Sequence, residues 1–215
     1  MSDLTGIILA GGQSRRMARD KSLMTLGGRT LVQRAVDALT PICADIVLVT
    51  NTPDKYDFPD LLKVPDAFPG TGSLGGLYSG LSAAGAERAI AVACDMPFLH
   101  TALLAYLAEL LADADAVVPN LSESGAPGAH APGAKAKQID FHPLHAAYRR
   151  ECLAPIEAQL RAGDLRMIGF LSHVRLRTVE RADIQRLDPQ LHSFFNVNTP
   201  EEWAIAEQIA AGGAA

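Results

Sequence analysis

The chain has 215 residues, of which 48% are hydrophobic and 20% charged, and its formal net charge is -5. This composition is typical of a folded globular protein with one sizeable core, and it excludes a fibrous or disordered chain. The acidic balance argues against broad nucleic-acid binding, which needs a basic face. We therefore expect one domain over residues 1–215 that binds small molecules rather than polymers.

The cysteines and the apolar segments indicate a cytoplasmic protein. Cys43, Cys94 and Cys152 are odd in number and far apart, and no Cys-x-x-Cys pair suggests a zinc site or a redox dithiol. Reduced thiols are the expected state. The apolar run near the N-terminus is too short for a signal peptide, and no stretch approaches the ~20 apolar residues of a membrane span. We expect no membrane partner.

Short apolar runs alternate with segments of helical periodicity over the first half of the chain. Runs without polar alternation predict strands covered on both faces, here at residues 6–9, 46–50, 89–93 and 116–118. Apolar residues at helical spacing predict helices at residues 31–39, 77–84 and 103–111. The repeated strand–helix order predicts an α/β fold with a Rossmann-like, doubly wound, mostly parallel sheet and helices on both faces.

The second half of the chain is less regular. Residues 120–142 are rich in glycine, alanine, proline and serine, and we expect a long loop that is either a tolerated insertion or a flap. A helical pattern resumes at residues 149–161. Thr199 followed by Pro200 and two acids predicts an N-cap and helix start. We expect Trp203 to pack this last helix against the sheet.

The segment after the first strand carries the strongest functional signal. Gly11 and Gly12 end the apolar run, and residues 15–21 then contain four positive charges. Like charges this close repel one another unless an anion lies among them. Backbone N–H groups in glycine-rich loops bind phosphates. We therefore expect a phosphorylated ligand here.

Two familiar phosphate-binding patterns do not fit this loop. Gly-x-Gly-x-x-Gly is absent because Gly11 and Gly12 are followed by Gln13 and Ser14, and the Lys21-Ser22 pair lacks the preceding glycine of a Walker loop. The actual pattern over residues 9–21 is Leu-Ala-Gly-Gly-x-Ser-x-Arg-Met-x-x-Asp-Lys.

This pattern resembles the signature of nucleotidyltransferases with a Rossmann-like fold, and in particular that of the molybdenum cofactor guanylyltransferases. Four further motifs of that family occur in order, at residues 64–66 with 72–77, 94–99, 143–148 and 195–202. Sugar-nucleotidyl and cytidylyl enzymes share versions of the first motif. The double glycine and Asn-Val-Asn-Thr-Pro-Glu-Glu are similar to the molybdopterin branch. The resemblance implies a fold like that of the nucleotide-diphospho-sugar transferases.

The resemblance also implies an activity: transfer of GMP from GTP to the phosphate of molybdopterin, expected in its molybdenum-loaded form, with release of pyrophosphate. Base choice depends on a few hydrogen bonds, so a cytidylyltransferase of the same cofactor and a sugar-phosphate nucleotidyltransferase stay open as alternatives. A non-catalytic adaptor is disfavoured, because Asp95 and Lys21 are both present. Transient docking to cofactor-delivery or acceptor proteins is compatible with the enzyme.

The site residues follow partly from chemistry. Phosphoryl transfer needs positive charge at the triphosphate, which Lys21 and Arg15 can supply, while Arg16 and Arg19 fit solvent exposure equally well. Asp95 follows an apolar strand, where a carboxylate suits a Mg²⁺ ion shared with substrate phosphates. With the resemblance, the expected nucleotide-binding residues are Leu9, Ala10, Gly11, Gly12, Lys21, Asn51, Asp66 and Asp95.

The remaining expectations concern the acceptor. The resemblance places Asn196 and Asn198 near the pterin, so residues 1–115 would bind the nucleotide and residues 116–215 the acceptor. The attacking phosphate is already anionic and needs no general base. We therefore expect His142 and His145 to pack in the loop or beside the pterin rather than to hold a metal. Asn51 can read a base edge through its donor and acceptor.

Two positions depart from the family pattern. Ala18 stands where the family usually has glycine, and a positive φ there would strain the loop by roughly 1 kcal/mol. Ser73 replaces the usual proline. Neither change removes a charged or metal-binding group, so we expect altered loop mobility rather than lost chemistry.

Overall fold

The structure is a computed structural model that describes residues 3–10, 21–122 and 140–212. The expectations for six residues of the first loop lie outside this part of the chain, as does most of the predicted loop at 120–142. Those six residues are Gly11, Gly12, Arg15, Arg16, Ala18 and Arg19.

Within the described residues, seven strands form a central sheet in the order β5-β4-β1-β6-β8-β7-β9. Neighbouring strands run parallel, except that β8 runs antiparallel to both β6 and β7. The predicted Rossmann-like, mostly parallel sheet is confirmed. The strands are β1 (Leu4–Leu9), β4 (Asp45–Val49), β5 (Leu62–Val64), β6 (Arg88–Ala93), β7 (Ala116–Asn120), β8 (His145–Arg149) and β9 (Leu176–Glu180).

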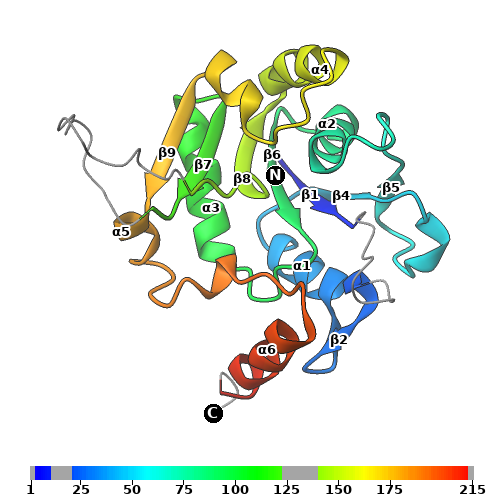
Figure 1. The fold of residues 1–215 in the computed structure, drawn as a ribbon, viewed down its shortest axis with the longest axis vertical. Coiled ribbons are helices and arrows are strands. Elements are labelled where there is room, and N and C mark those ends of the chain that lie inside the picture. The colour runs from blue at the N-terminus through cyan, green and yellow to red at the C-terminus, as the bar shows by residue number, and fades with distance from the viewer. Residues whose placement is uncertain (1–2, 11–20, 123–139, 213–215) are drawn as a thin grey trace.

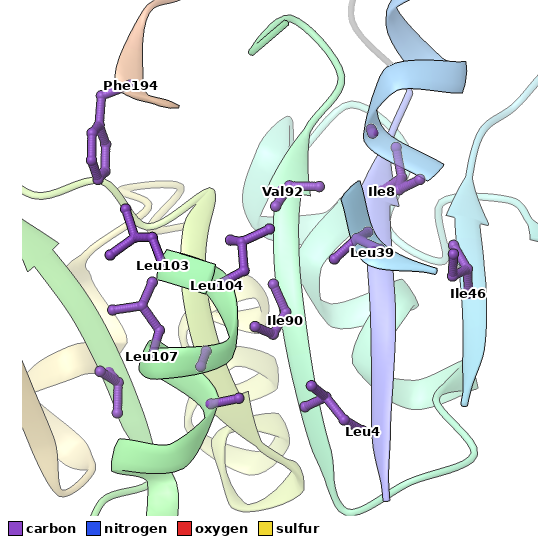
Figure 2. Packing of buried hydrophobic residues seen from close by; sticks show 14 of the residues in the cluster. Leu4, Ile8, Leu39, Ile46, Ile90, Val92, Leu103, Leu104, Leu107 and Phe194 are labelled. Carbon is purple, nitrogen blue, oxygen red and sulfur yellow. The ribbon is translucent and has the colours of Figure 1, made fainter. Parts of the chain in front are cut away.

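Helices cover both faces of this sheet, as Figure 1 shows. Successive β1 residues alternate between the faces: Ile8 packs with α1, α3 and α5, whereas Ile7 and Leu9 pack with α2 and α4. Figure 2 shows Ile8 within the first of these layers. The helices are α1 (Leu31–Leu39), α2 (Ser73–Ala83), α3 (Thr101–Glu109), α4 (Leu153–Arg161), α5 (Arg181–Ile184) and α6 (Pro200–Gly212).

Helix α6 begins where the sequence predicts. The Thr199 hydroxyl accepts the N–H of Glu202, and the Glu202 carboxylate accepts the N–H of Thr199, which is a reciprocal capping box. The expectation for Trp203 is wrong in one respect. Its ring packs with Leu26 of the small hairpin β2 (Thr25–Leu26) and β3 (Arg29–Thr30) and with Val197, not against the main sheet. The helix lies beside β2 in Figure 1.

Three strands and part of one helix escape the sequence pattern. Strand β5 has only three residues, β8 is mostly alanine and polar residues, and β9 exposes Arg177 and Thr178 at an edge. None of the three is the continuous apolar run that signals a doubly covered strand. Helix α2 starts at Ser73, four residues before the predicted start at residue 77. The sequence does not reveal this first turn because its glycines hide the helical periodicity.

The connection between β7 and β8 begins one residue later than the predicted loop at 120–142 and ends two residues later, because β8 starts at His145. Asn120 belongs to β7 and forms an isolated bridge with Phe141, and Leu121 donates its N–H to the Asp140 carbonyl at 2.9 Å. These contacts close the base of the connection. The choice between insertion and flap concerns residues 123–139 and stays a prediction. Among the described residues, no helix has the length and apolar character to cross a membrane.

The chain path marks one edge of the sheet as the place for a ligand. From β1 the chain moves outward through β4 to β5, and then returns through α2 to β6 on the other side of β1. The order therefore reverses between β1 and β6. Ligands of open α/β sheets bind beyond the carboxyl ends of the strands at such a point.

Candidate active site

A cavity of about 430 Å³ opens at this reversal, beyond the carboxyl ends of β1 and β6. Its other walls come from the chain after the first loop, the start of α2, the turn before β8 and the segment before α6. The lining residues are Leu9, Ala10, Lys21, Ser22, Ser73, Ala93, Cys94, Asp95, Met96, Phe141, His142, Pro143, Leu144, Met167, Asn196 and Asn198.

Asp95 lies half-buried just after β6, at the floor of the cavity. Its backbone carbonyl accepts the N–H of Val197 at 2.9 Å, so the end of β6 is tied to the C-terminal segment. Burial raises the pKa of the Asp95 carboxyl, the charge of Lys21 opposes the rise, and Glu202 adds to it. A carboxylate that has lost hydration in this way is stabilised by a neighbouring cation.

Lys21 opens the short 3-10 helix η1 (Lys21–Leu23), directly after the undescribed part of the loop. Its Nζ donates to Oδ1 of Asn198 at 3.1 Å. Asn198 is 177 positions further along the chain, and the Val197 N–H bond to Asp95 lies beside it. One short C-terminal segment therefore contacts both the side chain of the candidate phosphate-binding Lys21 and the backbone of Asp95.

A second, smaller cleft of about 30 Å³ lies next to the main cavity and shares Leu9 with it. Asn51 and Asp66 face each other there, and Asn51 Oδ1 accepts the N–H of Asp66 at 2.9 Å. The Asp66 carboxylate in turn accepts the N–H of Phe68 at 2.9 Å. This bond uses one of the two lone pairs on Asn51 Oδ1, so the side chain can still offer a ligand an acceptor as well as its NH₂ donors.

The start of α2 separates the two cavities. Gly72 is its N-cap with φ 70°, which favours glycine, and Ser73 is the first helical residue. A Cβ on Gly75 would meet Thr71 Oγ1 at 2.1 Å and Asp66 Oδ1 at 2.8 Å, so glycine is required there. Ser73 is thus the first residue of a helix and not part of a loop. Proline also suits a first helical position, so the departure changes the cavity wall more than the backbone.

Part of the cavity wall is apolar and comes from the second half of the chain. Phe141, Leu144 and Met167 line it together with His142. The His142 ring lies edge-on to Phe194 with centroids 4.9 Å apart, and burial lowers its pKa despite nearby Asp140. His145 lies deeper, with none of its side chain exposed, and packs at 4.5 Å on the same phenyl ring.

Oxygen donors at this cavity fit a hard divalent cation. The described residues contain no cluster of three or more His, Cys, Asp or Glu side chains that could enclose a metal ion. A cation bound to Asp95 would complete its shell with phosphate oxygens and water, which is how Mg²⁺ is usually held. The half-buried carboxylate with a raised pKa is consistent with such a partner.

The model of the MobA-like NTP transferase domain matches residues 6–177 of this sequence. The chain belongs to the MobA-like NTP transferase family. It is 37% identical to the molybdenum cofactor guanylyltransferase of Desulfosudis oleivorans over 99% of this chain and 98% of that protein. A probable molybdenum cofactor guanylyltransferase of Chloroflexus aggregans is 35% identical, with 95% and 93% covered. The family resemblance seen in the five motifs is confirmed.

Solved structures show the same NTP transferase fold. Molybdopterin-guanine dinucleotide biosynthesis protein A from Archaeoglobus fulgidus superposes with a TM-score of 0.76, at 24% identity, over 97% of this chain and 99% of that one. The 2-C-methyl-D-erythritol 4-phosphate cytidylyltransferase of Thermus thermophilus superposes with a TM-score of 0.67, at 18% identity, over 96% and 98%. At these identities the likeness to both solved structures is one of fold alone.

Within this family fold, the predicted site residues fall into three groups. Six line the main cavity: Leu9, Ala10, Lys21, Asp95, Asn196 and Asn198. Asn51 and Asp66 line the small cleft, and Gly11, Gly12 and Arg15 lie outside the described residues. Sequence reasoning missed the cavity wall formed by Phe141 and Met167, which no polar motif marks. It also missed Tyr56, which lies behind the cavity.

Proposed function

We propose that this NTP transferase transfers GMP from GTP to the phosphate of molybdopterin and releases pyrophosphate. The observation that carries the proposal is a cavity lined both by Lys21 with Asp95, which interact electrostatically, and by a group of apolar side chains. The charged pair suits a triphosphate with its cation, and the apolar group suits a planar ring system. The identity of the two substrates is inferred from the relatives, which are molybdenum cofactor guanylyltransferases.

The nucleotide is proposed to lie along the ends of β1, β4 and β6. Leu9 and Ala10 would contact it at the end of β1, with the backbone of Gly11 and Gly12 following. The base would lie across the mouth of the small cleft, which has room for about one water molecule, and there the NH₂ of Asn51 can donate to a base oxygen or ring nitrogen. Asp66 holds this cleft in shape through its bonds to Asn51 and Phe68.

The acceptor is proposed to lie against the apolar part of the cavity wall. Phe141 and Met167 offer apolar contact to a pterin, and Asn196 offers a polar side chain at the cavity. This assigns nucleotide binding to residues 1–115 and most acceptor contacts to residues 116–215. His142 would pack beside the pterin rather than act as a base, because burial lowers its pKa.

The reaction follows from these placements. An oxygen of the acceptor phosphate attacks the α-phosphorus of GTP and forms a P–O bond while the bond to the β-phosphate breaks, and the electron pair leaves on pyrophosphate. Lys21 neutralises the phosphates, and Arg15 is proposed to assist it. Mg²⁺ bound at Asp95 would supply positive charge to the phosphate oxygens. No residue has to remove a proton, since the attacking phosphate is already ionised.

Turnover with molybdopterin and each of the four nucleoside triphosphates, followed through pyrophosphate release, tests reaction and base choice together. We expect GTP to be the preferred substrate and turnover to require Mg²⁺. Higher turnover with CTP would favour the cytidylyl alternative. Turnover with sugar phosphates but not molybdopterin would favour a sugar-phosphate nucleotidyltransferase.

The Asp95→Asn variant tests the proposed metal site. It keeps the shape of the side chain but removes the charge, so we expect Mg²⁺-dependent turnover to fall by about 100-fold or more, on the order of 3 kcal/mol in the barrier. Glu151→Gln is the matched control, since that carboxylate is exposed at the end of β8 and away from the cavity. Full turnover by Asp95→Asn would move the metal site elsewhere.

A further inference from the structure

Tyr56 is a buried phenol that no motif marks and that lies behind the candidate site without lining it. Only 2% of the residue is exposed. It follows the 3-10 helix η2 (Pro53–Lys55), on the same connection after β4 that carries Asn51. A phenol in a hydrophobic core has one polar group to satisfy, and the partners it uses are informative.

The Tyr56 hydroxyl contacts two points of the chain that enclose the first loop. It donates to the backbone carbonyl of Ala10 at 2.9 Å, and it lies 2.8 Å from the hydroxyl of Ser22. A carbonyl only accepts, so the single phenol proton goes to Ala10. Ser22 must then donate to the phenol oxygen. One buried atom therefore joins the residue that follows β1 to the residue where the chain re-enters the core.

Both tethered points are part of the cavity wall. Ala10 lines the cavity and Ser22 directly follows Lys21, which also lines it. Ala10 is fixed on its other side as well, because its N–H donates to the Val49 carbonyl at 3.0 Å. The connection that bears Tyr56 starts at the end of the same strand β4. Strand β4 and the connection that follows it therefore fix the position of the backbone on both sides of the first loop.

We propose that Tyr56 is a positioning residue for nucleotide binding, and that it sets the place of Lys21 by tying Ser22 to Ala10. The proposal rests on the proposed function, in which Lys21 binds the triphosphate. Productive phosphate contacts require placement within about 0.5 Å, so a side chain that fixes the base of Lys21 affects affinity without touching the ligand. The same residue links the phosphate side of the site to the connection that carries Asn51.

Tyr56→Phe is the decisive variant, because it keeps the buried ring and removes one oxygen. We expect the dissociation constant for the nucleoside triphosphate that the wild type prefers, with Mg²⁺, to rise about tenfold. The KM for that nucleotide should rise by a similar factor, while the KM for the acceptor stays within about twofold. Tyr106→Phe is the matched control, since its half-buried hydroxyl makes no hydrogen bond within the described residues.

A double-mutant cycle with Ser22→Ala separates positioning from general loosening. If Ser22 acts through the phenol, Ser22→Ala weakens nucleotide binding in the wild type but adds little in the Tyr56→Phe background. Full additivity of the two effects would overturn the proposal. So would nucleotide affinity within about twofold of wild type in a Tyr56→Phe protein with a cooperative thermal transition.

Hydrogen exchange of the protein without nucleotide gives a readout independent of the proposed function. Tyr56→Phe should speed amide exchange in peptides that cover Ala10 and Ser22, and Tyr106→Phe should not. Unchanged exchange at both points overturns the proposal. A wild type that turns over no nucleotide contradicts the proposed function alone, and exchange then decides whether Tyr56 fixes these two points.

Discussion

Acidification should destabilise this protein through the buried His145. The residue is fully buried on β8, and burial lowers its pKa from the usual 6.5 to about 3, with the charge of His142 acting in the same direction. Neither ring nitrogen makes a hydrogen bond of good geometry within the described residues. The imidazole is therefore neutral in the folded chain over the whole mildly acidic range.

The sign and size of the effect follow from proton linkage. Because the folded pKa is lowered, the unfolded state binds the additional proton as the pH falls below 6.5, and stability is lost down to the folded pKa of about 3. Between about pH 7 and about pH 5, proton binding to this residue favours the unfolded state by a factor of about 25, which corresponds to about 2 kcal/mol of lost stability.

Urea unfolding at the two pH values measures the loss directly, with far-UV circular dichroism as the signal. His145→Leu removes the titrating ring but keeps an apolar side chain beside Phe194, so the loss should shrink by about 2 kcal/mol. His173→Gln, at an exposed histidine, is the control and should retain the wild-type pH dependence. A loss that is the same in His145→Leu and the wild type would refute the reasoning.

Three further substitutions test packing and the site. In Gly80→Ala the new Cβ would lie 2.3 Å from Ile7 Cγ2, so we expect a net loss of about 1 kcal/mol in urea unfolding after the gain in helix propensity. Gly76→Ala, whose Cβ would meet a flexible side-chain end at 2.6 Å, should cost less. Asn198→Leu removes the acceptor for Lys21 Nζ, and a KM for GTP unchanged within twofold would contradict the role given to that contact.

The sequence is most informative where local pattern and environment agree. The strands at residues 46–50 and 89–93 are buried on both faces and therefore purely apolar, and their predicted ends lie within one residue of β4 and β6. The Thr199 cap is correct because its hydrogen bonds involve residues three apart. Candidate site residues at strand ends, such as Asp95 in the cavity wall, can be recognised in the sequence. The local structure alone does not explain why a carboxylate follows an apolar strand.

Features that depend on distant partners could not be predicted. Helix α2 packs so closely on β1 that it needs Gly76 and Gly80, and these glycines remove the periodicity that would reveal it. Strand β8 is inserted between β6 and β7 although it follows both in sequence. The role of Tyr56 depends on two hydrogen bonds to residues 46 and 34 positions away. No local pattern in the sequence encodes such pairings.

The contacts around the cavity also bear on the expectation that residues 1–115 bind the nucleotide and residues 116–215 bind the acceptor. Lys21 and Asp95 belong to the proposed nucleotide half, yet Lys21 donates to Asn198, and the Asp95 carbonyl accepts the N–H of Val197. Both bonds come from the segment that the sequence assigned to the acceptor. Since β8 and this segment complete the cavity only after the chain has returned from β7, the acceptor half positions the groups that bind the nucleotide. The two proposed binding functions therefore share the contacts of one C-terminal segment, a side-chain bond to Lys21 and a backbone bond to Asp95.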